Sequence, residues 1–80
     1  MVKRDGAETR RERISQIARA LQAALFESKS GEISLSKFVG VMMFQTGLTK
    51  EKVMEYLEVI ETMDQAELDV LNDKIKKPQV

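Results

Sequence analysis

The chain has 80 residues, 42% of them hydrophobic and 32% charged, with 13 basic and 13 acidic side chains that give a formal net charge of zero. This length holds one small domain, and the composition is typical of a folded chain rather than a disordered one. Cysteine and histidine are both absent, which excludes disulfide staples, thiolate nucleophiles, imidazole bases and the usual zinc sites.

No apolar run reaches the roughly 20 residues that a helix needs to cross a bilayer, and the charged first residues do not resemble a secretory signal. We therefore expect a cytoplasmic protein that makes no membrane contact and carries no cofactor. We do not expect an enzyme, because the acidic side chains are of surface type and no pocket is implied around them. The function is expected to reside on the surface.

Charge is unevenly distributed along the chain. Residues 1–37 carry an excess of basic groups, residues 38–73 hold only Lys50 and Lys52 against eight acidic groups, and three lysines follow Asp73. Both ends are therefore basic and the middle is acidic. If the two basic ends converge in the fold, they could together bind a polyanion. The alternative is that each charged side chain is solvated or ion-paired at the surface and has no common role.

The first segments in chain order are an arm and a helix. Residues 1–8 lack apolar periodicity and are predicted to form a flexible basic arm. From Thr9 onward, apolar residues recur every three or four positions as far as Leu25, which predicts an amphipathic helix. Thr9 and Glu12 match a capping box, so Thr9 is the predicted N-cap. The stretch that begins at Ser28 ends this helix.

Two later segments share one pattern, in which an apolar residue and then a hydroxyl residue precede a helix. The hydroxyl residues are Ser34 and Thr49, and each can cap the free N–H groups of a helix start. The first of these two helices is predicted to end at or just before Thr46, because Gly47 suits the positive φ of a helix C-terminus. Two capped helices joined by a short turn with glycine indicate a helix-turn-helix.

The C-terminal segment fits two structures. Strict alternation of apolar and polar residues over 66–70, followed by the turn residues 72–73, predicts a β-hairpin with Val70 opposite Ile75. The alternative is a helix that continues to Lys77, which would be unusually long for so small a domain.

The hairpin is the favoured prediction. It requires the helix that starts after Thr49 to end at Asp64 or Gln65. Residues 32–33 are then predicted to add a short third strand to the same sheet.

The helix over residues 35–46 is apolar around more of its circumference than a two-sided helix needs. One explanation is a fully buried helix, and the alternative is a homodimer seam that includes Val41, Met43 or Phe44. Gly40 inside this helix costs about 1 kcal/mol relative to Ala, which suggests a close approach by a neighbouring backbone.

The order of these elements resembles a known family. The run from Glu32 to Phe38, the turn over residues 46–49 and the stretch from Lys50 to Ile75 are similar to the winged helix-turn-helix DNA-binding domain of small archaeal and viral transcription regulators. The resemblance covers residues 9–77 and leaves residues 78–80 as a tail. It implies an α+β, mainly α fold, with three helices and a C-terminal β-hairpin wing.

In such domains the helix after the turn lies in the major groove of DNA. The resemblance therefore implies a DNA-binding protein, a transcription regulator that places the helix starting at Thr49 in the groove of double-stranded DNA, and a homodimer would suit a palindromic site. The implied DNA-binding residues are exposed positions at the two helix starts, on the wing and in the basic N-terminal region: Ser34, Ser36, Lys37, Thr49, Lys50, Glu51, Lys52, Met54, Glu55, Lys74, Lys76, Lys77, Arg4, Arg10, Arg11 and Arg13.

An acidic face on the same helix leaves a second function open. Glu55, Glu58 and Glu61 follow its first turn, and carboxylates near phosphates oppose DNA binding. The alternative function is a winged-helix module for protein–protein interaction that makes no direct DNA contact. We interpret the three carboxylates as solvated helix charges and not as a metal site, because a calcium cage needs more oxygen ligands on a tight loop.

Overall fold

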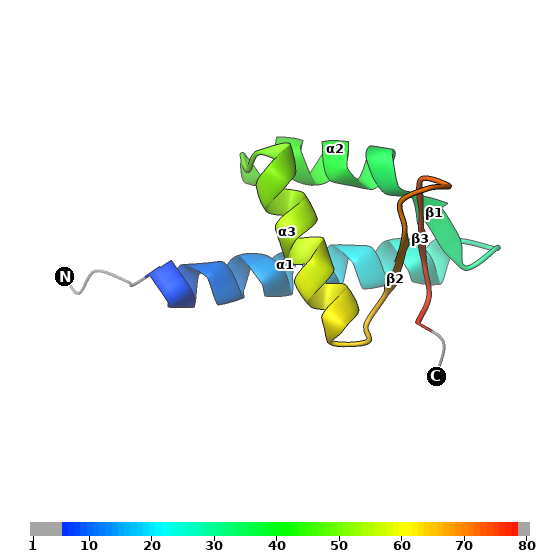
Figure 1. The fold of residues 1–80 in the computed structure, drawn as a ribbon, viewed down its shortest axis with the longest axis horizontal. Helices are drawn as coiled ribbons and strands as arrows, with labels where there is room; N and C mark the ends of the chain where they lie inside the picture. Colours follow the sequence, from blue (N-terminus) through cyan, green and yellow to red (C-terminus); the bar gives the residue numbers. More distant parts are fainter. Residues whose placement is uncertain (1–5, 79–80) are drawn as a thin grey trace.

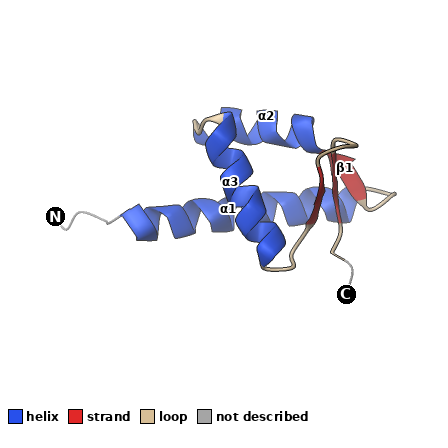
Figure 2. Ribbon diagram, viewed as in Figure 1, coloured by secondary structure: helices blue, strands red, loops and turns tan. Residues whose placement is uncertain are grey.

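The structure is a computed structural model that describes the backbone of residues 6–78 and the side chains of residues 9–78. Over this part of the chain, three helices pack with a small three-stranded antiparallel sheet, one strand following α1 and two following α3 (Figure 1, Figure 2). The elements are α1 Gly6–Glu27, β1 Glu32–Ser34, α2 Leu35–Thr46, α3 Lys50–Thr62, β2 Glu67–Asp69 and β3 Lys74–Lys76. This mainly helical α+β architecture is compatible with a winged-helix fold.

The first helix is longer than predicted. α1 begins at Gly6, so Thr9 lies inside the helix, and the prediction of Thr9 as its N-cap is wrong. Alanine and glutamate at the next two positions are good helix formers, which extends the helix toward the N-terminus. The predicted flexible arm is therefore wrong for residues 6–8, which belong to α1, and residues 1–5 lie outside the described residues.

The predicted capping of the two later helices is confirmed. The Ser34 side chain accepts a hydrogen bond from the Lys37 N–H, and the Thr49 side chain accepts one from the Lys52 N–H. Both cap residues have extended backbone conformations, as N-caps do. The end of α3 differs from the prediction, since the helix stops at Thr62, two residues early.

β3 lies at the centre of the sheet, in the order β1-β3-β2, and pairs antiparallel with both neighbours. The predicted third strand is therefore confirmed. Ile75 lies opposite Ile33 of β1 and opposite Leu68 of β2, so three apolar side chains lie across the same face of the sheet.

The hairpin is confirmed but its predicted register is wrong. Leu68, and not Val70, pairs with Ile75, and four residues rather than two form the turn. The observed register is favoured because Leu68 packs against the core, whereas Val70 is 64% exposed. Asp69 stabilises this longer turn by accepting hydrogen bonds from the backbone and the side chain of Asn72, at 3.2 and 2.9 Å.

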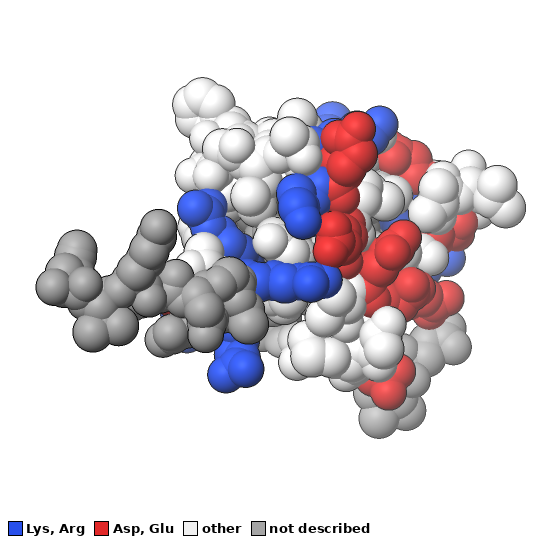
Figure 3. Space-filling view, turned by 60° about the vertical axis from the view of Figure 1, so that its left-hand side comes forward, with Lys and Arg blue, Asp and Glu red and all other residues white. Residues whose placement is uncertain are grey.

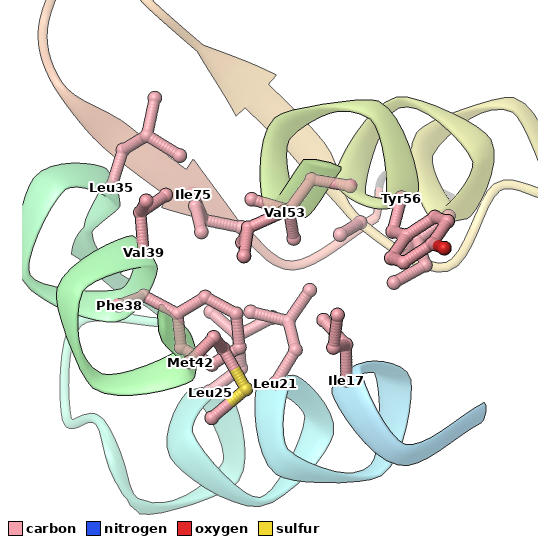
Figure 4. Close-up of a cluster of buried hydrophobic side chains, with 13 residues drawn as sticks. Ile17, Leu21, Leu25, Leu35, Phe38, Val39, Met42, Val53, Tyr56 and Ile75 are labelled. Carbon is pink, nitrogen blue, oxygen red and sulfur yellow. The ribbon is translucent and has the colours of Figure 1, made fainter. Parts of the chain in front are cut away.

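One core joins the three helices to the sheet. Its most deeply buried members include Ile17 and Leu21 of α1, Leu57 of α3 and Ile75 of β3, all without exposed surface. Figure 4 shows side chains from all three helices and from β3 pointing toward one another. This shared core fixes the position of α3 relative to α1 and α2.

α2 is only half buried, so the explanation of a fully buried helix is wrong. It buries Leu35, Phe38, Val39 and Met42, but Phe44 is 91% exposed. The expectation of a close backbone approach at residue 40 is also wrong within the described part of the chain, because a Cβ added to Gly40 would meet no atom within 4 Å. The outer surface of α2 is therefore apolar and open.

Candidate nucleic-acid interface

A sharp corner separates α2 from α3. Gly47 has a φ of 74° and donates its N–H to the Met43 carbonyl at 2.9 Å, the left-handed arrangement that closes a helix C-terminus. Leu48 packs against the core, and Thr49 then caps α3. The prediction of two separate helices at this corner is confirmed.

The first turn of α3 faces outward. Thr49, Lys50, Glu51 and Lys52 are all exposed, whereas Val53 is completely buried. Burial of one face of α3 thus anchors the helix and leaves its N-terminal turn accessible. A helix N-terminus also carries a partial positive charge from its free N–H groups.

Two arginines of α1 lie beside this corner. The Arg13 Nη1 donates a hydrogen bond to the Thr46 carbonyl at 2.9 Å, which satisfies a carbonyl at the C-terminal end of α2. The Arg10 Nη2 lies 2.8 Å from Glu55 Oε1 on α3, and its guanidinium stands 5.9 Å from the centre of the Tyr56 ring. The N-terminal half of α1 is thereby brought next to the N-terminal half of α3.

These contacts create a basic surface that we call the corner patch. Figure 3 shows basic side chains gathered on this end of the molecule, with acidic side chains along the flank beside them. Arg11 is exposed and forms no ion pair with a described residue, while Lys52 lies 3.5 Å from Glu55. The corner patch consists of Arg10, Arg13, Thr49, Lys50 and Lys52.

The N-terminus of α2 is occupied from within the chain. Asp73, in the turn of the hairpin, accepts hydrogen bonds from the Ser36 hydroxyl at 2.6 Å, the Ser36 N–H at 3.0 Å and the Ser34 hydroxyl at 3.1 Å. Its backbone carbonyl also accepts the Leu35 N–H at 3.0 Å. A carboxylate therefore already fills the place at this helix start where a phosphate would bind.

The hydrogen bonds from Ser36 are the main reason that the pKa of Asp73 lies below its ordinary value. The Ser34 hydroxyl and the charge of Lys50 act in the same direction. Donors that stabilise the charged form keep the carboxylate ionised. Lys37, the third predicted contact at this helix start, remains exposed.

The predicted wing lysines lie on the sheet, at the other end of α2 from the corner (Figure 1). Lys74 lies 2.9 Å from Glu32, and Lys76 lies 3.4 Å from Asp69. The first pair lowers the pKa of Glu32 and raises the pKa of Lys74. Lys77 is exposed, and its N–H bonds to the Gly31 carbonyl.

Met54 faces a groove between α2 and α3. It is half-buried, and it lines a hollow of about 480 Å³ together with Val39, Met43 and Lys50. Met54 and Glu55 therefore serve contacts within the chain, whereas Glu51 is free at the surface. Arg4 lies outside the described residues.

The fold thus brings together only part of the predicted set. Arg10 and Arg13 of α1 lie beside α3 and the end of α2, and Ser36 lines the same hollow as Lys50, while the sheet lysines lie at the other end of α2. Sequence analysis missed Asp73 as a cap of α2 because no local pattern links residues 37 positions apart.

Comparisons of the chain with protein-family models, with curated proteins and with solved structures gave no match. Among the residues that the structure describes, no helix has the length and apolar character needed to cross a membrane. The candidate function therefore follows from the residues of the site alone.

Proposed function

We propose that the protein binds double-stranded DNA through the corner patch, as a transcription regulator in which the first turn of α3 faces the major groove. The observation that carries this proposal is the contact between Arg13 and the Thr46 carbonyl at 2.9 Å, which places the α1 arginines beside the exposed start of α3. A two-fold pair of such domains would bind half-sites about 34 Å apart.

Some basic side chains of the corner patch are held by contacts within the chain, and others are available to contact phosphates. Arg10 pairs with Glu55, and Arg13 bonds to a carbonyl. Lys50 forms no ion pair with a described residue, and Lys52 makes only a long, exposed contact with Glu55. Two available cations predict a slope of about −2 for the logarithm of the affinity against the logarithm of the salt concentration.

Acidic side chains beside the corner patch limit its affinity for DNA. Glu51 and Glu58 on α3 are exposed, and each carboxylate near a phosphate opposes the release of counterions that drives binding. The Ser34 and Ser36 donors are left out of the proposed interface because Asp73 holds them. The sheet lysines are left out because Glu32 and Asp69 pair with two of them.

A titration with fluorescent random-sequence duplex DNA at several salt concentrations tests the proposal. The variant Lys50→Ala/Lys52→Ala is expected to weaken binding and to reduce the salt slope by about 2, because two phosphate contacts are lost. The matched control is Arg19→Ala/Lys29→Ala, which removes the same charge from exposed positions outside the patch and should retain the wild-type slope. Absence of binding at low salt, or an equal loss in both variants, contradicts the proposal.

A second candidate function rests on the acidic surface of α3. Glu51 and Glu58 are exposed, and Glu55 and Glu61 are partly exposed, so this helix would also suit a basic segment of a protein partner. The DNA titration separates the two functions. Failure to bind duplex DNA at low salt favours the protein partner, and a steep fall of affinity with salt favours DNA.

A further inference from the structure

An apolar surface lies on the side of α2 that faces away from the core. Phe44 is 91% exposed and Val41 is 48% exposed, although both are in the middle or last turn of a well-formed helix. Burial of large apolar side chains is favourable, and a chain of this size gains little by leaving two of them in water. This surface is open for burial against a partner.

A groove opens directly beside these side chains. It has a volume of about 420 Å³ and lies between α1 and α2, with Ala20, Ala23 and Ala24 on one wall and Val41 on the other. α1 and α2 pack less closely against each other than each of them packs against α3. The short alanine side chains leave the space between them unfilled.

Phe44 does not line the groove of its own chain, although the groove extends along α2 as far as Gln45. Because Arg13 bonds to the Thr46 carbonyl, the C-terminal end of α2 lies beside the first half of α1. Glu27, Lys37 and Ser34 line the groove at its opposite end. Phe44 is 91% exposed and does not line this groove, so it leaves the groove of its own chain unfilled.

A second copy of the chain can place Phe44 there. If two α2 helices cross antiparallel with the two-fold axis near Val41, residue 44 of one copy lies level with residue 38 of the other, about 4.5 Å from the axis along the helix. Lys37 and Phe38 line the groove at that level. One surface thus supplies both a projecting side chain and the hollow that accepts it, as an isologous interface requires.

Gly40 and the local charges suit the same arrangement. Gly40 lies on the exposed side of α2, and a Cβ at this position would meet no atom within 4 Å, so a partner helix can approach its backbone closely. The charged residues that line the groove, Glu27 and Lys37, have opposite signs. Two copies that meet here do not repel, whereas two acidic α3 surfaces would.

We infer that the outer face of α2, together with the groove between α1 and α2, is a homodimer interface in which Phe44 of each copy inserts into the groove of the other. This inference does not depend on DNA binding. It leaves the exposed first turn of α3 accessible, since Lys50 and Met54 face the other side of α2.

Sedimentation of the full chain from micromolar to millimolar concentration tests the interface. Wild-type protein is expected to dimerise, and Phe44→Glu is expected to raise the dimer dissociation constant at least about thirtyfold, as for an aromatic residue at an interface centre. The matched control is Phe26→Glu, at a position that is 84% exposed on α1 and does not line the groove. It should dimerise as wild type does, and circular dichroism should show both variants folded.

Cysteine cross-linking tests the position of the axis, since the chain has no cysteine of its own. Val41→Cys is expected to form an intermolecular disulfide with oxidised glutathione, because two residues near a two-fold axis lie within reach of each other. Leu71→Cys, 97% exposed in the hairpin turn, should cross-link much more slowly. A wild-type protein that stays monomeric, a Phe44→Glu protein that dimerises normally, or equal cross-linking at both positions overturns the inference.

Discussion

Asp73 and Ser36 are joined by two hydrogen bonds, from the Ser36 hydroxyl at 2.6 Å and from the Ser36 N–H at 3.0 Å. The first residue belongs to the hairpin turn and the second to the first turn of α2, so one carboxylate connects the sheet to the helix-turn-helix unit. A negative charge also stabilises a helix N-terminus through the helix dipole. The hairpin and α2 are therefore expected to lose stability together when this charge is removed.

Replacement of Asp73 by Asn is predicted to lower the melting temperature at pH 7 by a few degrees. Asn tolerates the positive φ of 56° at this position, so the change removes the charge without adding backbone strain. The pKa of Asp73 is lowered in the folded state, chiefly by Ser36. Its stabilisation is therefore complete above the ordinary value of 3.8 and is lost as the pH falls through the lowered folded value.

The difference between wild type and Asp73→Asn should accordingly shrink as the pH falls below 3.8. Thermal melts followed by circular dichroism across the acidic range measure this difference. Asp64→Asn is the matched control, because Asp64 also has a positive φ, of 60°, but does not contact α2. A gap between wild type and Asp73→Asn that is the same at every pH would contradict the prediction.

Two glycines of the same region should respond in opposite directions to the same substitution. Gly47→Ala is predicted to destabilise the protein by about 1–2 kcal/mol, because a Cβ is unfavourable in the left-handed conformation, and Gly47 has a φ of 74°. Gly40→Ala is predicted to stabilise the monomer by about 1 kcal/mol, since alanine is the better helix former and the added Cβ meets no atom.

Urea unfolding at a concentration where the chain is monomeric measures both changes. Each kcal/mol corresponds to a shift of about 4–8 °C in the melting temperature of a domain of this size. A loss of stability in Gly40→Ala would show that residue 40 is packed more closely than the structure describes.

A leucine in the core and a leucine in the hairpin turn should respond very differently to substitution by alanine. Leu57 of α3 has no exposed surface, whereas Leu71 is 97% exposed. Leu57→Ala is predicted to cost about 2–5 kcal/mol through lost burial and a cavity, and Leu71→Ala to stay within about 0.5 kcal/mol of wild type. Urea unfolding again provides the measurement, and a large loss of stability in Leu71→Ala would contradict the exposure of the hairpin turn.

The predictions that succeeded depend on short-range chemistry. Ser34 and Thr49 bond to N–H groups three residues away, and Gly47 turns the chain at one position, so a few consecutive residues suffice to specify these features. The register of the hairpin depends instead on which leucine or valine the rest of the molecule buries. Alternation along the segment allowed both registers, and only contact with the core selects Leu68.

In the candidate site, too, some features depend on neighbouring residues and others on how distant elements pack. The exposed first turn of α3 follows from the cap at Thr49 and the buried Val53. The approach of Arg13 to Thr46 joins residues 33 positions apart, and it depends on how α1 crosses the other helices. The sequence pattern therefore indicated which basic residues are candidates for binding, but it did not indicate which of them share one surface.

Glu55 should restrain DNA binding, because it holds Arg10 at 2.8 Å and Lys52 at 3.5 Å. Glu55→Gln removes a negative charge beside the corner patch and releases Arg10, the more closely held of the two cations, so the affinity for duplex DNA at low salt is predicted to rise severalfold and the salt slope to steepen by about 1. Stability should change by less than about 1 kcal/mol, since the side chains of the Arg10–Glu55 pair are 49% and 41% exposed. Glu67→Gln on β2 is the control with the same charge change away from the patch. Equal affinities for the two variants would show that the corner patch is not the surface that contacts DNA.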